Sequence, residues 1–263
     1  MSYIDSNKEA WEEAFENKRL NWGDDNHLRL KREYLPFFND DMKKELEGID
    51  FSHKTVAQFC CNNGRELLSL MKLGANDGVG FDIAENIIGQ AKATAQKAGI
   101  HNCAFTACNI LDIPESYDNQ FHFIFFTIGA ITWFKDLSLL FQKAERCLKP
   151  NGLLLINDFH PLMNMLSLPG DEGFCADDPN RFSNSYFQKE PWIENNGMGY
   201  MSIEYKSKTF TSFSHTMSDI VNSLSENGMK TIKLNEYDYD IGMTDVYNGR
   251  GFPLSFILIA EKC

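Results

Sequence analysis

The segment from Val56 to Asp82, VAQFCCNNGRELLSLMKLGANDGVGFD, has the pattern of a short buried strand, a tight turn, a helix and a second strand that ends in an acid. A strand that enters such a turn presents backbone N–H groups to a ligand, and turns of this kind usually carry three glycines. Here only Gly64 remains, with Cys60 and Asn62 in place of the first two. Cysteine is small, and asparagine tolerates positive φ better than other non-glycine residues, so the turn stays possible.

Asp82 ends the second strand of this segment, 18 residues after Gly64. That spacing is near the one at which a carboxylate meets the ribose hydroxyls of a bound nucleoside. The segment therefore predicts a nucleoside-binding turn. The alternative is an ordinary strand–helix turn with Asp82 on the surface.

Apolar segments of strand length alternate with helical patterns around the quoted segment. Near-continuous apolar strands that alternate with helices predict a parallel sheet covered on both faces. We expect strands at Thr55–Cys60, Gly78–Ile83, Cys103–Ile110, Phe121–Ile128 and Leu153–Phe159, and helices at Arg65–Leu73 and Glu85–Ala98 and along the face formed by Leu137, Leu140, Phe141, Ala144 and Leu148.

The alternation stops after Phe159, where the chain becomes rich in Pro, Gly, Asn and Asp with scattered aromatic residues. The predicted fold class is α/β: a doubly wound, mostly parallel seven-stranded sheet whose last strands are antiparallel. Residues 1–50 are expected to form an N-terminal helical cover, and residues 51–263 a domain with an insertion at about 161–211. Later elements are expected as a strand at Met201–Phe210, a helix at Met217–Asn227 with Ser214 and Thr216 as caps and Gly228 at its end, and strands at Thr231–Tyr237 and Phe256–Glu261.

The composition excludes several classes of partner. A net charge of -12 without a basic run would repel a phosphate backbone, so we expect no nucleic-acid partner. The most hydrophobic stretch, Phe123–Ile131, is too short to span a bilayer, and the first residues lack the apolar core of a signal peptide. Seven cysteines without a CxxC pair predict reduced thiols and no metal site, and so a cytoplasmic protein. The oligomeric state is left open.

Five segments of the chain resemble the class I S-adenosylmethionine-dependent methyltransferases, and the resemblance runs from about Tyr34 to Lys262. The segment with the helix, the LKPxG turn and the buried strand is the most specific of them. The five segments are FCCNNGRE (59–66), GFDIAENII (80–88), ACNILDIP (107–114), FHFIFFTIGAITWF (121–134) and AERCLKPNGLLLI (144–156).

The resemblance implies S-adenosylmethionine as cofactor and assigns a role to each segment. The first turn would lie under the methionine part, the acid of the second segment would hold the ribose, the third would meet the adenine, and the fourth would face the methyl group. The implied cofactor-binding residues are Phe59, Cys60, Asn62, Gly64, Asp82, Ile83, Asn109, Ile110, Thr127, Ile128, Gly129 and Trp133.

Three residues depart from the family pattern: Gln58 and His122 stand where the family commonly has acids, and Asn109 often would be Asp. Two other functions stay open at this point. One is a protein that binds S-adenosylmethionine without catalysis, which the altered turn suggests. The other is a nicotinamide-dependent oxidoreductase, although its three-glycine fingerprint is absent.

Methyl transfer from a sulfonium is an in-line displacement that depends mainly on positioning, so a general base is optional. His160 follows the fifth strand and is the candidate base; alternatively it only caps the turn made by Pro161. The acidic charge, the lack of a docking module and the single insertion favour a small-molecule acceptor. The candidate acceptor-site residues are Trp11, Tyr186, Trp192 and His215, together with Phe182 and Phe187 of the insertion; the alternative is that these aromatic residues only anchor it.

Overall fold

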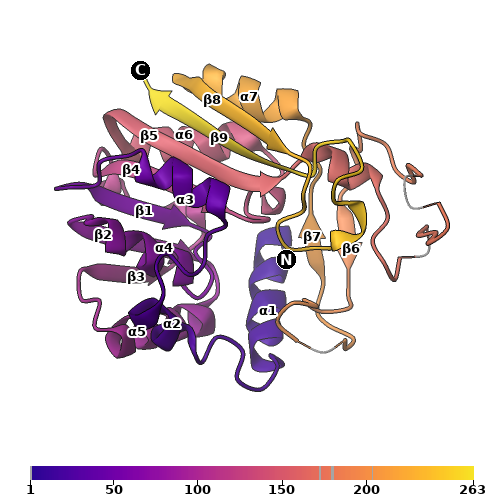
Figure 1. The fold of residues 1–263 in the computed structure, drawn as a ribbon, viewed down its shortest axis with the longest axis horizontal. Helices are drawn as coiled ribbons and strands as arrows, with labels where there is room; N and C mark the ends of the chain where they lie inside the picture. Colours follow the sequence, from indigo (N-terminus) through magenta and orange to yellow (C-terminus); the bar gives the residue numbers. More distant parts are fainter. Residues whose placement is uncertain (1, 172, 179–180, 203) are drawn as a thin grey trace.

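The computed structural model describes residues 2–171, 173–178, 181–202 and 204–263. A seven-stranded sheet has the strand order β3-β2-β1-β4-β5-β9-β8 (Figure 1). The first five strands in the chain pair in parallel, and β9 pairs antiparallel with both β5 and β8. The doubly wound fold predicted from the sequence is therefore confirmed. The strands are β1 (Thr55–Phe59), β2 (Asp77–Asp82), β3 (Cys103–Ala107), β4 (Phe121–Thr127), β5 (Leu148–Phe159), β8 (Met229–Tyr237) and β9 (Ser255–Lys262).

Helices cover both faces of this sheet because adjacent residues of each strand point to opposite sides. In β4, Ile124 and Phe126 pack in the core beneath α6 and α7, whereas Phe123 and Phe125 pack in the core beneath α2, α3, α4 and α5. The N-terminal helices α2 and α3 thus share a core with the sheet. The helices are α2 (Asn26–Arg32), α3 (Asp40–Glu47), α4 (Arg65–Leu70), α5 (Glu85–Ala98), α6 (Leu137–Cys147) and α7 (Met217–Glu226).

Several predicted boundaries shift in the structure. The third strand ends at Ala107, so Cys108 lies in a turn rather than on a strand, and β5 begins at Leu148 rather than Leu153. Thr216 alone caps α7, whereas the Ser214 hydroxyl accepts a hydrogen bond from the Trp192 indole at 2.8 Å.

The predicted strand at Met201–Phe210 is wrong for the described residues of that segment. A three-residue strand, β7 (Phe210–Ser212), begins only at its end and pairs antiparallel with β6 (Trp192–Glu194) in a separate small sheet. Met201 is instead fully buried against Ala84 and Ile87 near the end of β2. Tertiary packing, which local propensity does not capture, fixes this part of the insertion.

The first helix, α1 (Tyr3–Glu16), joins the insertion to the rest of the fold. The side chain of Asn7 is 5% exposed; it donates to the Thr211 carbonyl at 2.8 Å and accepts from the Thr211 N–H at 2.7 Å. Trp11 packs edge-on against Phe210, and Lys8 forms an ion pair with Glu85 of α5. Figure 1 shows α1, β6 and β7 beyond the carboxyl ends of the parallel strands, so together they form a roof over that edge of the sheet.

Gly64, between β1 and α4, is required by packing as well as by conformation. Its φ is +71°, and a Cβ at this position would lie 2.3 Å from the Phe105 ring of β3. Gly74 has a φ of +91°, but nothing lies within 4 Å of its Cβ position. The two glycines therefore share the left-handed conformation and differ in the space around them.

We predict that Gly64→Ala destabilises the fold more than Gly74→Ala. Both variants carry a left-handed alanine, which costs about 1–2 kcal/mol. Only Gly64→Ala also forces the Phe105 ring to move, at an added cost of roughly 1–3 kcal/mol. Urea denaturation of the two variants gives the difference in the free energy of unfolding; equal losses would show that the Phe105 contact does not matter.

Candidate functional site

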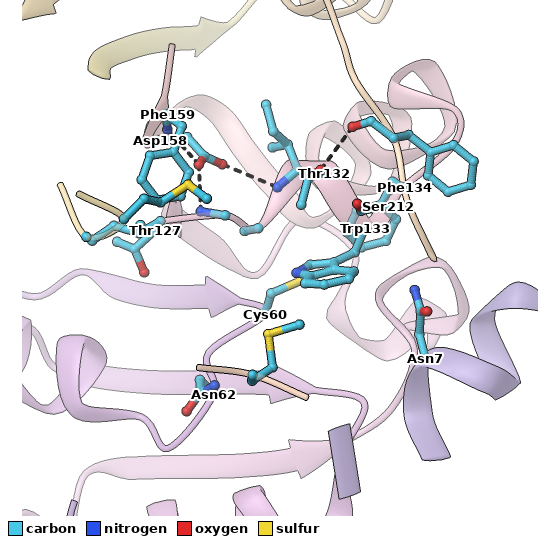
Figure 2. A pocket seen from close by; sticks show the side chains of 18 of the residues that line it. Asn7, Cys60, Asn62, Thr127, Thr132, Trp133, Phe134, Asp158, Phe159 and Ser212 are labelled. Carbon is cyan, nitrogen blue, oxygen red and sulfur yellow. Dashed lines mark hydrogen bonds between the residues drawn. The ribbon is translucent and has the colours of Figure 1, made fainter. Parts of the chain in front are cut away.

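A cavity of about 700 Å³ lies between the carboxyl ends of β1, β2, β4 and β5 and the roof made by α1, β6 and β7. This volume lies in the range of roughly 300–1,000 Å³ that is typical of small-molecule sites. Figure 2 looks into the cavity, with Cys60 and Asn62 from the turn after β1, Thr127 from β4 and Trp133 from the loop after β4.

The turn after β1 keeps the backbone conformation that glycines would supply. Cys60 has a φ of +55° and Asn62 a φ of +47°. The Asn62 N–H donates to the Asp82 carboxylate at 2.8 Å, and the Cys61 N–H donates to the Phe81 carbonyl at 2.8 Å. Hydrogen bonds to the end of β2 thus hold the turn in a conformation that its side chains disfavour.

Asp82 lies at the centre of this arrangement. One carboxylate oxygen accepts from the Asn62 N–H, and the other accepts from the Ala84 N–H at 3.1 Å. Burial raises the pKa of Asp82 above its ordinary value, although these backbone donors oppose the shift. A carboxylate oxygen accepts more than one hydrogen bond, so Asp82 can still bind a ligand hydroxyl in the cavity that it lines.

Asn109 follows β3 and is held by its own turn. Its side-chain oxygen accepts from the Leu111 N–H at 3.3 Å, and its amide nitrogen donates to Asp112 at 2.9 Å. Both Asn109 and the neighbouring Ile110 line the cavity. Asn109 therefore offers a fixed amide to a ligand.

Asp158, near the end of β5, organises the loop after β4. It is 3% exposed and accepts from the backbone N–H groups of Gly129 at 2.6 Å, Phe159 at 2.8 Å and Ile131 at 3.4 Å (Figure 2). Burial raises the pKa of Asp158 to about 6, against the lowering effect of these donors. Asp158 thus anchors the loop that follows the neighbouring strand β4.

The two departures from the expected acids have structural roles. Gln58 is 1% exposed; its amide donates to the Thr127 hydroxyl at 2.8 Å and accepts from the Leu67 N–H at 3.1 Å, so it ties β1 to β4 and α4. His122 accepts from the Thr55 N–H at 3.0 Å and does not line the cavity among the described residues. Of the two, only Gln58 lies in the site.

A family model described as a methyltransferase domain matches residues 48–206, more than half of the chain, including the turn, Asp82, Asn109 and Asp158. Members of this family use S-adenosylmethionine. The chain belongs to the class I S-adenosylmethionine-dependent methyltransferase family. The resemblance seen in the sequence is thereby confirmed.

Individual relatives share less of the chain. A ribosomal protein L11 methyltransferase of Vibrio vulnificus is 40% identical over 112 residues, which are 43% of this chain and 36% of that relative. The chain thus spans about a third of that protein's length.

Solved structures share the fold over nearly their whole length. An S-adenosylmethionine-dependent methyltransferase from Mesorhizobium loti has a TM-score of 0.61 at 15% identity and covers 83% of this chain and 96% of its own. Geranyl diphosphate C-methyltransferase from Streptomyces coelicolor A3(2) has a TM-score of 0.63 at 11% identity and covers 100% of this chain and 98% of its own. At these identities the likeness establishes the fold.

The described residues fit the methyltransferase cofactor. The cavity offers the Asp82 carboxylate for hydroxyls, the Asn109 amide for an amine or ring nitrogen, and the faces of Ile83, Ile110 and Trp133 for a flat ring. Within the described ranges, no group of three His, Cys, Asp or Glu side chains is placed to hold a metal ion. The same ranges contain no helix with the length and apolar character that a membrane span requires.

Two histidines of this methyltransferase lie at the cavity. His160 is 7% exposed; its Nδ1 accepts from the Leu162 N–H at 3.1 Å and its Nε2 lies 2.9 Å from Glu236. The His215 Nε2 donates to the Phe134 carbonyl at 2.9 Å. Burial lowers the pKa of both rings, and Glu236 opposes the shift at His160. His160 thus caps the turn at Pro161, with both ring nitrogens already bonded.

Most of the residues predicted for the site line the cavity, including Trp11, Trp192, His160 and His215. Five predicted positions do not. Phe59 is fully buried between Phe81 and Phe126, and Gly64 faces Phe105 rather than a ligand. Tyr186 accepts from the Met217 N–H at 3.0 Å, and Phe182 and Phe187 are more than half exposed, so these three do not line the cavity, whereas Trp192 of the same insertion does.

Several other lining residues were not predicted for the site. Arg65 and Glu66 come directly after the glycine of the quoted turn and carried a usable signal, because they are charged residues at a ligand-binding turn. Many of the others come from α1, the insertion and the loop before β9, where no motif marks them; they include Tyr3, Asn7, Tyr200 and Ile241–Met243.

We predict that Asn62→Gly keeps cofactor affinity, whereas Asn62→Val weakens it. Glycine adopts a φ of +47° freely, but a β-branched residue there is strained. The dissociation constant for S-adenosylhomocysteine, measured by calorimetry, should rise at least about tenfold for the valine variant if roughly 1–3 kcal/mol of strain releases the turn. Equal affinities would mean that the turn conformation does not govern binding.

We predict a pH dependence of stability that comes from Asp158. The pKa of Asp158 is about 6 in the fold and 3.8 ordinarily. In the pH window between these two values, the folded protein keeps a proton that the unfolded chain has released. The free energy of unfolding should fall as the pH rises through the window, by up to about 3 kcal/mol relative to Asp158→Asn. Urea denaturation of both proteins across the window measures the difference; parallel curves would refute the assignment.

Proposed function

We propose that this protein transfers the methyl group of S-adenosylmethionine to a small-molecule acceptor. The observation that carries the proposal is the roofed cavity at the carboxyl ends of the strands, which has room for a ligand beside the cofactor site. The fold of the whole domain supports the same activity, since it matches methyltransferases over nearly their full length. We infer one functional unit in which residues 1–50 and the insertion at about 161–211 cover the site.

The proposed cofactor site keeps the roles that the sequence predicted. Asp82 with Ile83 would hold the ribose, Asn109 with Ile110 the adenine, and the turn at Cys60 and Asn62 the methionine part. Thr127, Ile128 and Gly129 would face the reacting methyl group, and Trp133 would meet the adenine or the acceptor. The cofactor, when bound, supplies an electrophilic methyl group on a sulfonium.

The residues of this chain would act mainly by position. In-line displacement requires that the acceptor atom and the methyl carbon be collinear and that water be excluded. The loop held by Asp158 fixes one side of the cavity, and the roof of Trp11, Trp192 and Phe213 closes the other. We propose that His160 and Glu236 position the β5 end rather than take a proton, since both ring nitrogens of His160 are bonded.

The acidic residues on the acceptor side of the cavity favour an uncharged or cationic acceptor. Asp171 and Glu194 lie there, and burial together with the charge of Asp171 raises the pKa of Glu194. A carboxylate or phosphate acceptor would meet repulsion from both acids. The ribosomal protein L11 methyltransferase relative raises a protein acceptor as the second candidate, but it matches over only 43% of this chain.

We predict that the purified protein methylates a component of the low-molecular-weight fraction of a cell extract. With isotopically labelled S-adenosylmethionine, label should appear in the ultrafiltrate and not in ribosomal protein L11.

Asp82→Ala should weaken S-adenosylhomocysteine binding at least about tenfold, because charge-assisted hydrogen bonds are worth roughly 1.5–3 kcal/mol. Trp192→Ala should raise the KM for the acceptor and leave cofactor affinity unchanged.

Each rival function has its own outcome in this experiment. Label confined to protein L11 would replace the small-molecule acceptor by a protein. Cofactor binding without any labelled product from any fraction would favour a binding protein without catalysis. Binding of NAD in place of S-adenosylhomocysteine would favour the oxidoreductase.

A further inference from the structure

Arg65 is the single Lys or Arg side chain among the described residues that line the cavity. The lining acids outnumber it: Glu66, Asp82, Asp158, Asp171 and Glu194. An anionic group of any ligand in this cavity therefore has one side chain of fixed positive charge to meet.

Arg65 and Glu66 form a preorganised pair of opposite charges at the cavity wall. The Arg65 Nε donates to the Glu66 carboxylate at 2.7 Å, and the Glu66 side chain is 9% exposed. The guanidinium also lies over the Phe37 ring, 5.5 Å from its centroid, which is within the range of a cation–π contact. The Nε contact leaves the two terminal nitrogens of Arg65 and the second oxygen of Glu66 available to a ligand.

The pair has the charge pattern of an α-amino acid. S-Adenosylmethionine carries an α-carboxylate and an α-ammonium on one carbon, whereas its adenosine part is uncharged. A guanidinium binds a carboxylate through two parallel N–H donors, and a carboxylate accepts from an ammonium. Next to the pair, the Asn62 amide donates to the Tyr200 hydroxyl at 3.1 Å, so polar groups continue along this wall.

We propose that Arg65 and Glu66 recognise the amino-acid end of the cofactor, with the Arg65 terminal nitrogens on the α-carboxylate and Glu66 on the α-ammonium. The proposal rests on S-adenosylmethionine as the cofactor, which the proposed function shares. It goes beyond that function because it assigns the two charges of the amino-acid end to Arg65 and Glu66, which the proposed cofactor site does not include.

The test compares two ligands that differ only at that end. S-Adenosylhomocysteine carries the amino acid, and 5′-methylthioadenosine lacks it. Arg65→Met should weaken S-adenosylhomocysteine roughly tenfold to a hundredfold, as expected for a charged hydrogen-bonded contact, and leave 5′-methylthioadenosine unchanged. Glu66→Gln should show the same selectivity with a smaller effect. Calorimetry with each purified variant measures both dissociation constants.

Arg29→Met is the matched control variant. Arg29 also lies over the Phe37 ring, 4.6 Å from its centroid, and pairs with Glu33, but it is not among the described residues that line the cavity. It should alter neither dissociation constant. Asp82→Ala should weaken both ligands, because both carry the ribose.

The outcomes separate this inference from the proposed function. Equal loss of both ligands in Arg65→Met, or no loss of S-adenosylhomocysteine, overturns the assignment of the pair. Failure of the wild-type protein to bind either ligand overturns the proposed function instead. If Arg65→Met does not fold, the wild-type protein still decides: it should bind decarboxylated S-adenosylmethionine more weakly than S-adenosylmethionine, and equal affinities would refute the role of Arg65.

Discussion

The reversal of strand order between β1 and β4 is the constraint on which the site depends. The chain leaves β1 toward β2 and later returns to β4 on the other side, so the loops after these neighbouring strands diverge to opposite faces of the sheet. A crevice at the carboxyl ends results from this topology in any doubly wound sheet. Here Gln58 bridges the two strands through Thr127, and Asp158 fixes the position of the diverging β4 loop by accepting a hydrogen bond from Gly129.

Hydrogen bonds to the end of β2 stabilise the turn after β1, at positions where glycines would usually stand. Cys60 and Asn62 keep positive φ although both carry side chains, and the Asp82 carboxylate holds the Asn62 N–H at the end of the next strand. Only Gly64 cannot be replaced in this way, because Phe105 occupies the space of a side chain there. The reduced glycine count is thus compatible with an intact site.

Local sequence pattern was enough to predict the sheet and the cofactor side of the cavity, but not the features that contacts between distant segments decide. Alternating apolar strands and helices predicted the seven-stranded sheet, and the turn and Asp82 marked the proposed cofactor site. The pairing of β6 with β7 and the position of Tyr186 away from the cavity depend on contacts between segments far apart in the chain. Asn7, whose partner Thr211 lies at the end of the insertion, has no signal in its own neighbourhood.

The site is divided between the framework, which is the seven-stranded sheet with its helices and turns, and the roof made by α1, β6 and β7. This division bears on how the acceptor is selected. The proposed cofactor residues lie on strand ends and turns that the framework fixes, whereas the proposed acceptor residues lie on α1 and the insertion, which Asn7 and Trp11 join. Methyl transfer needs little beyond a collinear arrangement of acceptor atom and methyl carbon and the exclusion of water. A change of acceptor therefore requires a change in the roof and not in the sheet and its helices. Residues of the roof therefore carry the specificity in our proposal, and they are the residues that local sequence pattern identifies least well.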